Sequence, residues 1–313
     1  MEWYFIVLIV IAILILLLFI TMRICYNICF YINRKKDLPP DDFDSLPGDI
    51  YKPYKEKMIK WMEETKALDS KEYTITSFDG LKLYGKYYHL ENSDTIEIMF
   101  HGYRGSAERD LCGGSQRAFA VGHSAFVVNQ RGSGQSEGNF QTFGVNEHKD
   151  CLLWINKVIE EFGSDIKIVL AGVSMGAATA IMASSSENLP KNVIGVIADC
   201  SYSSQKEVII KTIKEMKLPP KIFYPILKLS AKIFGKFNLE ELTPLEAIKK
   251  SKVPTIILQG DKDDIVPPYM AQELYEANPK NNKLVIFEGA GHCACVLKDS
   301  KLYINSLNEF FKK

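Results

Sequence analysis

An unbroken apolar run opens the chain, and Thr21 is its one mildly polar residue between Trp3 and Met22. A helix of this length is ~30 Å long, which matches the hydrocarbon core of a bilayer. A cleaved signal peptide begins with basic residues and ends at a small-residue site, whereas this run follows Glu2 and continues into bulky residues. The pattern therefore predicts an uncleaved transmembrane helix, in preference to a signal peptide or a buried core helix.

Basic residues flank only the C-terminal side of this predicted span, at Arg23 and at positions 34–36. Positive charge near the end of a span favours the cytoplasmic side. We therefore expect a single-pass protein with its N-terminus outside and the domain that follows the span at the cytoplasmic face. Apolar residues such as Phe30 and Ile32 are interpreted as an interfacial extension of the helix, and palmitoylation of Cys25 or Cys29 is the alternative.

Beyond a proline-containing polar connector, short apolar runs alternate with amphipathic stretches. Runs at 72–78 and 81–89, joined by Asp79-Gly80, predict a hairpin. Further strands are expected near residues 95, 125, 167, 193, 254 and 283, with helical stretches near 107, 145, 175, 268 and 298. This alternation predicts one α/β domain, with a mostly parallel eight-stranded sheet covered by helices on both faces.

A long excursion separates the strands near 193 and 254. Its sequence, about 203–250, mixes apolar stripes with many lysines, as in an amphipathic helical lid. We expect most of its apolar residues to pack on the core, and any that are exposed to contact an apolar substrate or lipid.

Composition excludes several classes of function. The chain has 38 basic and 38 acidic residues and no formal net charge, so no electrostatic argument favours nucleic acid. Seven cysteines lie without regular spacing, and Cys293-Ala294-Cys295 lacks zinc-finger spacing. We therefore expect no disulfide framework, no metal and no cofactor.

The candidate chemistry centres on Gly172-Val173-Ser174-Met175-Gly176, which reads G-x-S-x-G between a predicted strand and a predicted helix. This is the context of a nucleophile elbow, where the serine hydroxyl projects from the sheet and the glycines permit the sharp turn. A serine nucleophile needs a base and a carboxylate that orients the base. His292 follows the last predicted strand and is the candidate base.

Three candidate acids, Asp261, Asp263 and Asp264, follow the strand near 254, and spacing alone does not choose among them. The order of nucleophile, acid and histidine is that of the α/β-hydrolase superfamily, which residues 70–313 resemble. The resemblance includes bacterial serine aminopeptidase-like hydrolases and membrane-associated depalmitoylase-like proteins. It implies an α/β-hydrolase fold with a small helical cap, and it assigns the triad acid to Asp263, with Asp261 bracing the turn and Asp264 facing solvent.

The same resemblance implies an oxyanion hole made of backbone N–H groups. One belongs to Met175, and the other to Tyr103, in the loop 101–105 after the strand near 95. In this loop His101 is expected to organise hydrogen bonds rather than transfer protons.

Two further polar features are interpreted as structural. The loop 129–138 resembles the superfamily's Asp-x-Arg-Gly-x-Gly-x-Ser loop, although Asn129 replaces the usual aspartate. It lacks the Lys-Ser/Thr ending of a phosphate-binding loop. Asp199, which follows another predicted strand, is expected to be structural as well.

Together these features predict a membrane-anchored serine hydrolase that cleaves a carboxylic ester, thioester or lipid acyl bond through an acyl-enzyme. The expected partners are a small-molecule or acyl substrate and the membrane, and the sequence identifies no protein partner. The alternatives are a serine peptidase of the aminopeptidase-like kind and a catalytically silent scaffold that binds a partner at the membrane. The expected division is an anchor with its basic flank at 1–36, a connector with a short helix at 37–69, and a catalytic domain at 70–313.

Overall fold

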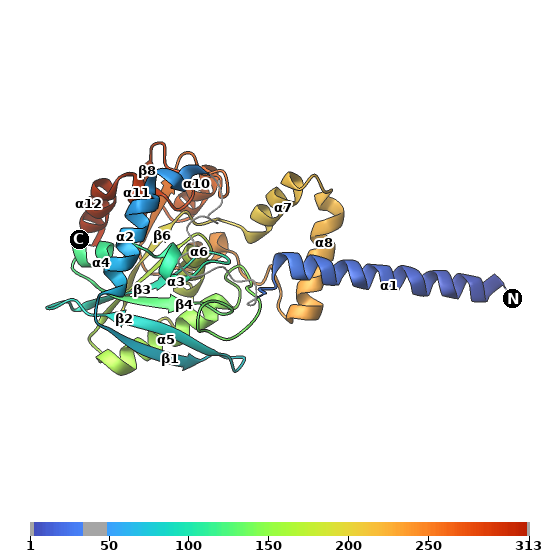
Figure 1. Cartoon of the computed structure of the whole chain (residues 1–313), viewed down its shortest axis with the longest axis horizontal. Helices are drawn as coiled ribbons and strands as arrows, with labels where there is room; N and C mark the ends of the chain where they lie inside the picture. Colours follow the sequence, from blue (N-terminus) through green and yellow to red (C-terminus); the bar gives the residue numbers. More distant parts are fainter. Residues whose placement is uncertain (1–2, 34–48, 312–313) are drawn as a thin grey trace.

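An eight-stranded sheet with helices on both faces forms the body of the protein in a computed structural model that describes residues 3–33 and 49–311 (Figure 1). The strand order is β1-β2-β4-β3-β5-β6-β7-β8. β2 pairs antiparallel with β1 and β4, and the other neighbours pair in parallel. The strands are β1 (Ser70–Thr76), β2 (Lys82–Tyr88), β3 (Thr95–Phe100), β4 (Ser124–Asn129), β5 (Lys167–Val173), β6 (Val193–Asp199), β7 (Thr255–Gly260) and β8 (Asn282–Phe287).

Helices occupy the predicted positions between the strands, which confirms the predicted α/β-hydrolase fold class. One expected helix, near residue 107, is divided in two at Gly113, whose backbone has φ +79°. The helices are α1 (Trp3–Cys29), η2 (Asp49–Tyr54), α2 (Lys55–Lys66), α3 (Ala107–Asp110), α4 (Gly114–Ala120), α5 (Glu147–Phe162), α6 (Met175–Ser184), α7 (Gln205–Glu215), α8 (Pro220–Ser230), η3 (Ala231–Gly235), α9 (Pro244–Lys250), α10 (Pro268–Ala277), α11 (Cys295–Lys298) and α12 (Ser300–Phe311).

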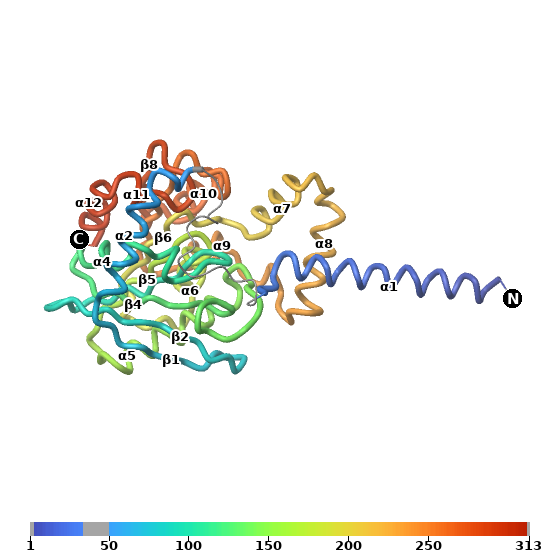
Figure 2. The backbone as a smooth tube through the Cα atoms, in the orientation of Figure 1, coloured from blue at the N-terminus to red at the C-terminus, as the bar shows by residue number. Residues whose placement is uncertain are grey.

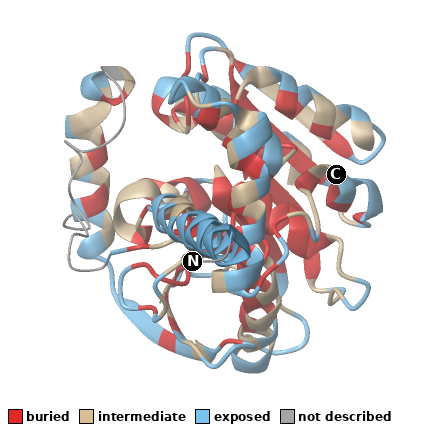
Figure 3. Ribbon diagram, turned by 90° about the vertical axis from the view of Figure 1, so that its right-hand side faces the viewer, coloured by how far each residue is buried: buried red, intermediate tan, exposed pale blue. Residues whose placement is uncertain are grey.

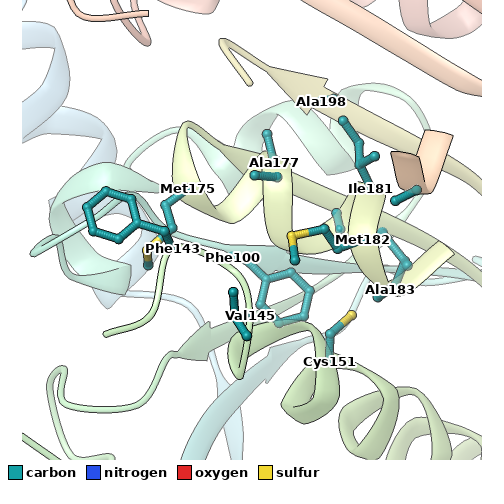
Figure 4. Packing of buried hydrophobic residues seen from close by; sticks show 14 of the residues in the cluster. Phe100, Phe143, Val145, Cys151, Met175, Ala177, Ile181, Met182, Ala183 and Ala198 are labelled. Atoms are coloured by element: carbon teal, nitrogen blue, oxygen red, sulfur yellow. The ribbon is translucent and has the colours of Figure 1, made fainter. Parts of the chain in front are cut away.

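Alternate residues of the central strands face two separate apolar layers. On β3, Ile98 and Phe100 join the layer that contains α5, α6, α9 and α10, while Met99 joins the layer of α4, α11 and α12. Figure 4 shows part of the first layer, where Phe100 of β3 lies near Val145 and near Met182 of α6. All ten residues of α6 are buried, so the helix that follows the candidate nucleophile is enclosed by the fold.

The segment between β6 and β7 forms a helical cap of α7, α8, η3 and α9. The backbone trace shows α7 and α8 projecting from the sheet toward the side from which α1 extends (Figure 2). Phe234 of η3 packs against Phe19 of α1, with ring centroids 5.2 Å apart. Four large apolar cap residues are more than 40% exposed: Met216, Ile222, Leu229 and Ile233.

Helix α1 is long and apolar enough to cross a membrane by its length and composition. It extends to Cys29 and is therefore longer than the predicted span, which ended at Met22. Most of it is exposed, as Figure 3 shows, and its C-terminal end meets the domain. The predicted basic residues at 34–36 and residues 37–48 of the predicted connector lie outside the described residues, and the predicted domain boundaries stay predictions.

The end of α1 is anchored in the domain by aromatic packing. Phe30 is fully buried, and its ring centroid lies 5.2 Å from that of Phe237 and 6.1 Å from that of Phe143. Backbone hydrogen bonds continue this contact, since Ile32 donates to Asn139 O at 2.7 Å. The prediction that Phe30 and Ile32 extend an interfacial helix is therefore wrong: the helix ends at Cys29, and both residues enter the core because aromatic neighbours distant in sequence enclose them.

Replacing Phe30 with alanine should destabilise the protein by about 3–5 kcal/mol, since it removes a fully buried ring and leaves a cavity. Unfolding of the full chain in detergent micelles, followed by tryptophan fluorescence, measures the loss. Ile24→Ala is the matched control, because Ile24 lies on the same helix and is 52% exposed. Equal losses in the two variants would contradict the anchoring role of Phe30.

Candidate active site

Ser174 lies at the tight turn between β5 and α6, with φ 54° and ψ −116°. The glycines on either side make this turn possible. A Cβ on Gly172 would lie 2.2 Å from the backbone carbon of Gly176, and one on Gly176 would lie 2.0 Å from Phe100 O. Only glycine fits at either position. The two glycines permit a sharp turn from strand to helix, and the Ser174 hydroxyl projects beyond the end of the sheet.

His292 lies between Ser174 and Asp263. Its Nε2 is 2.9 Å from Ser174 Oγ, and its Nδ1 is 2.7 Å from Asp263 Oδ2. The Asp263 carboxylate is held in turn by the backbone N–H groups of Ile265 and Val266, at 3.0 and 2.8 Å. The three predicted residues thus form one continuous hydrogen-bonded series across the ends of β5, β7 and β8.

The other aspartates have different surroundings. Asp261 accepts a hydrogen bond from Gly289 N at 2.6 Å and so connects the acid loop to the loop that carries His292. Asp264 is exposed. Asp199 is buried at the end of β6, and its carbonyl oxygen accepts the Ser174 N–H at 2.8 Å. Only Asp263 among these carboxylates contacts the histidine in the described part of the chain.

The Asp263 carboxylate sets the protonation of His292. Burial alone lowers the pKa of a histidine, but the hydrogen bond and the charge of Asp263 outweigh it, so the pKa of His292 is raised above the ordinary value. With Nδ1 donating to the carboxylate, the neutral ring presents its Nε2 lone pair to Ser174 Oγ. This is the arrangement a general base requires.

The loop 101–105 passes beside Ser174. A Cβ on Gly102 would lie 3.7 Å from Ser174 Cβ. Within the loop, His101 Nδ1 donates to Gly102 O at 2.8 Å, and its Nε2 accepts the Gln130 N–H at 3.0 Å. Burial lowers the pKa of His101, which keeps the ring neutral. His101 therefore organises the loop by hydrogen bonding, as predicted.

The two predicted oxyanion donors lie on the segments that flank the serine. Met175 is the first residue of α6, where backbone N–H groups have no partner inside the helix. Tyr103 follows Gly102, and its ring stacks on Phe143 with centroids 4.8 Å apart.

The end of α1 contacts this same loop, which the sequence did not indicate. The Tyr103 phenol donates to Cys29 O at 2.6 Å. The Arg104 guanidinium donates to Ile28 O at 2.7 Å and to Tyr31 O at 3.1 Å. These donors satisfy carbonyls at the helix C-terminus that have no partner within the helix. The apolar helix is thereby bonded to the loop next to Ser174.

A second unpredicted contact supports the histidine loop. The Tyr51 phenol of η2 donates to the carbonyl oxygen of His292. Ile50 packs so closely on the loop that a Cβ on Gly291 would lie 1.8 Å from its Cδ1. No local motif marks Tyr51, because its partner lies 241 residues later.

The loop after β4 is structural, as predicted. Arg131 is fully buried and pairs with Asp150 and Asp79, each at 2.8 Å. Asn129, which stands where an aspartate is usual, lies directly against Gly134: a Cβ there would be 2.6 Å from Asn129 Cγ. In the part of the chain that the structure describes, neither Arg131 nor Asn129 forms a hydrogen bond with Ser174, His292 or Asp263.

Thiol and carboxylate groups that could hold a metal lie behind the histidine. One set is Cys200, His292 and Cys293, and the other is Asp199, Cys200 and Cys295; in each, the ligand atoms lie within 4.8 Å of one another. A metal bound by the first set would compete for His292 with Ser174 and Asp263.

Comparison with known proteins agrees with this architecture. The family described as alpha/beta hydrolase fold matches residues 98–237, from β3 into the cap. The chain is 26% identical over 256 residues to the uncharacterized protein YqkD of Bacillus subtilis, and the match covers 79% of this chain and 81% of that protein. It is 32% identical over 185 residues to the uncharacterized membrane protein YNL320W of Saccharomyces cerevisiae, and the match spans 57% of each chain.

A solved structure shows the same fold. The Pyrococcus furiosus esterase Pf2001 superposes with a TM-score of 0.64 at 24% identity, covering 80% of this chain and 92% of the esterase. The family match, this structure and the strand order agree, and together they show that the chain has the α/β-hydrolase fold.

Proposed function

We propose that the protein is a membrane-anchored serine hydrolase that cleaves carboxylic ester bonds. The same chemistry would cleave the acyl esters of lipids and the thioesters of acylated thiols. The observation that carries the proposal is His292 held between Ser174 Oγ and Asp263 Oδ2, at 2.9 and 2.7 Å. The similarity in fold to a Pyrococcus furiosus esterase supports the ester as the bond cleaved.

In the proposed reaction, Ser174 Oγ attacks the acyl carbon while His292 Nε2 takes its proton. The backbone N–H groups of Tyr103 and Met175 stabilise the negative oxygen of the tetrahedral intermediate. His292 then returns the proton to the departing alcohol or thiol, which leaves the acyl group on Ser174. Water, deprotonated by the same nitrogen, then attacks the acyl carbon; the acid leaves as the bond to Ser174 Oγ breaks, and His292 returns the proton to Ser174 Oγ. Asp263 stabilises the imidazolium in both halves.

The cap and α1 support an acyl substrate that comes from a bilayer. Helix α1 has the length and apolar composition of a membrane span, and a relative in yeast is described as a membrane protein. Phe234 of the cap packs on this helix, and the exposed Ile222, Leu229 and Ile233 lie on the same cap helices. Exposed apolar side chains grouped in this way are typical of a surface that meets a ligand or lipid. The cytoplasmic placement of the domain stays an expectation from basic residues after the span.

Ser174→Ala should reduce hydrolysis of p-nitrophenyl esters by roughly 10⁴- to 10⁶-fold, as expected when a triad loses its nucleophile. The measurement uses the full chain in detergent and a series of acyl lengths, since removal of residues before 37 would delete buried Phe30. Ser185→Ala, at the other end of α6, is the control and should remain active. Full activity in Ser174→Ala, or no labelling of the folded wild type by a fluorophosphonate, would refute the proposal.

The kcat/KM of the wild type should rise with pH with a midpoint above about 6.5, the ordinary pKa of histidine. The sign follows from His292: Asp263 stabilises the protonated ring, so the pKa is raised, and activity is lost as pH falls through it. Asp263→Asn should lower this midpoint and reduce kcat by about 10⁴-fold. A pH–rate series tests this, with exposed Asp264→Asn as control; an unchanged midpoint in Asp263→Asn would contradict the assignment.

Tyr103→Phe should lower kcat by about fivefold with little change in KM, because loss of one hydrogen bond of about 1 kcal/mol frees the oxyanion loop from Cys29 O. The substitution keeps the backbone N–H and the aromatic ring. Steady-state kinetics measure the split between kcat and KM. Tyr87→Phe removes a phenol that bonds His89, remote from the site, and should leave both parameters unchanged. A change in KM alone would show that the phenol does not position the loop.

A further inference from the structure

Three free thiols lie behind the candidate histidine, on segments far apart in sequence. Cys200 directly follows β6, and Cys295 begins α11, 95 residues later. Both side chains are fully buried, and their sulfurs are 3.8 Å apart. The third thiol, Cys293, donates its backbone N–H to Cys200 Sγ at 3.2 Å.

The sulfur–sulfur separation fits a tetrahedral metal. Two Zn–S bonds of ~2.3 Å at the tetrahedral angle place the sulfurs ~3.8 Å apart. No movement of Cys200 or Cys295 is then needed to bring both within bonding distance of one ion.

A carboxylate completes a set of three ligands. A carboxylate oxygen of Asp199 lies within 4.8 Å of the sulfurs of Cys200 and Cys295. The side chain is 2% exposed, and its Oδ1 has no hydrogen-bond partner among the described residues. A buried polar atom without a partner is rare in proteins and requires an explanation, which a bound cation supplies.

We propose that Asp199, Cys200 and Cys295 form a binding site for a zinc-class divalent cation. Two thiolates with one carboxylate select zinc over magnesium or calcium, which prefer oxygen ligands alone. Each ligand binds in its deprotonated form, so every proton held by a thiol or by the Asp199 carboxyl group passes to solvent on binding. The oxidation state of sulfur and metal does not change.

A cavity that adjoins Asp199 has room for a fourth ligand. It has a volume of about 50 Å³ and is lined by Asp199 and Cys293. A water molecule needs roughly 10–15 Å³ of such space, so water can reach the cation and complete a tetrahedron.

The alternative set of Cys200, His292 and Cys293 is less favourable for a stable site. His292 already bonds Asp263 through Nδ1 and Ser174 through Nε2, so a metal on either nitrogen would break one of these contacts. The set with Asp199 leaves both contacts intact. A cation there ties the end of β6 to the loop that carries His292, because Cys295 lies three residues after the histidine.

Cobalt titration of the metal-free full chain in detergent tests the site. One equivalent of Co²⁺ should produce the near-ultraviolet sulfur-to-cobalt absorption of thiolate ligands. Added Zn²⁺ should abolish this absorption and raise the melting temperature. Cys200→Ser and Cys295→Ser should each weaken cobalt binding by at least roughly tenfold. Cys112→Ser is the matched control, since Cys112 lines the same cavity outside the ligand set, and should bind as the wild type does.

Three outcomes overturn the proposal. The first is a folded wild type with no thiolate–cobalt absorption, a result that does not depend on whether any variant folds. The second is an absorption that persists at full strength in Cys200→Ser or Cys295→Ser, as it would if Cys25 and Cys29 were the ligands. The third is retention in Cys295→Ser with loss in Cys293→Ser, which would assign the metal to the set containing His292.

Discussion

The left-handed backbone of Ser174 is the constraint on which the rest of the site depends. This conformation costs roughly 1–3 kcal/mol in a residue with a side chain. Two contacts maintain it. Gly172 and Gly176 let β5, α6 and the end of β3 lie so close together that no Cβ would fit. The Ser174 N–H also donates a hydrogen bond to Asp199 O of the neighbouring strand. The turn fixes the hydroxyl above the sheet, and the loops after β3, β7 and β8 meet there as a consequence of parallel pairing.

Two segments outside the α/β fold support the two halves of this site. The end of α1 bonds the loop of Tyr103 and Arg104, while Tyr51 of η2 bonds the loop of His292. Both segments precede the first strand of the sheet. The apolar helix therefore supports the candidate site directly, because its last carbonyl groups accept hydrogen bonds from side chains of the loop next to Ser174.

The features that sequence could predict are those encoded locally. Apolar periodicity predicted every strand, and G-x-S-x-G predicted the turn at Ser174. The choice of Asp263 needed the resemblance to a family, since three aspartates share one loop. Contacts between distant segments left no local signal. Phe30 has the pattern of one more apolar residue after a span, and Cys200, whose sulfur lies 3.8 Å from that of Cys295, comes 95 residues earlier in the sequence.

The exposed apolar side chains of the cap are explained by the position of the cap beside α1. In water, exposed side chains such as Ile222, Leu229 and Ile233 would be unfavourable beside a helix that is itself apolar on all sides. Next to a bilayer the same residues can contact acyl chains, while exposed lysines such as Lys221 and Lys232 remain near headgroups. If α1 spans a bilayer as proposed, its bonds to the loop beside Ser174 set the distance from the membrane surface to this serine. A substrate that leaves the bilayer along the cap would then reach the serine without crossing bulk water, which favours acyl groups too apolar to diffuse freely.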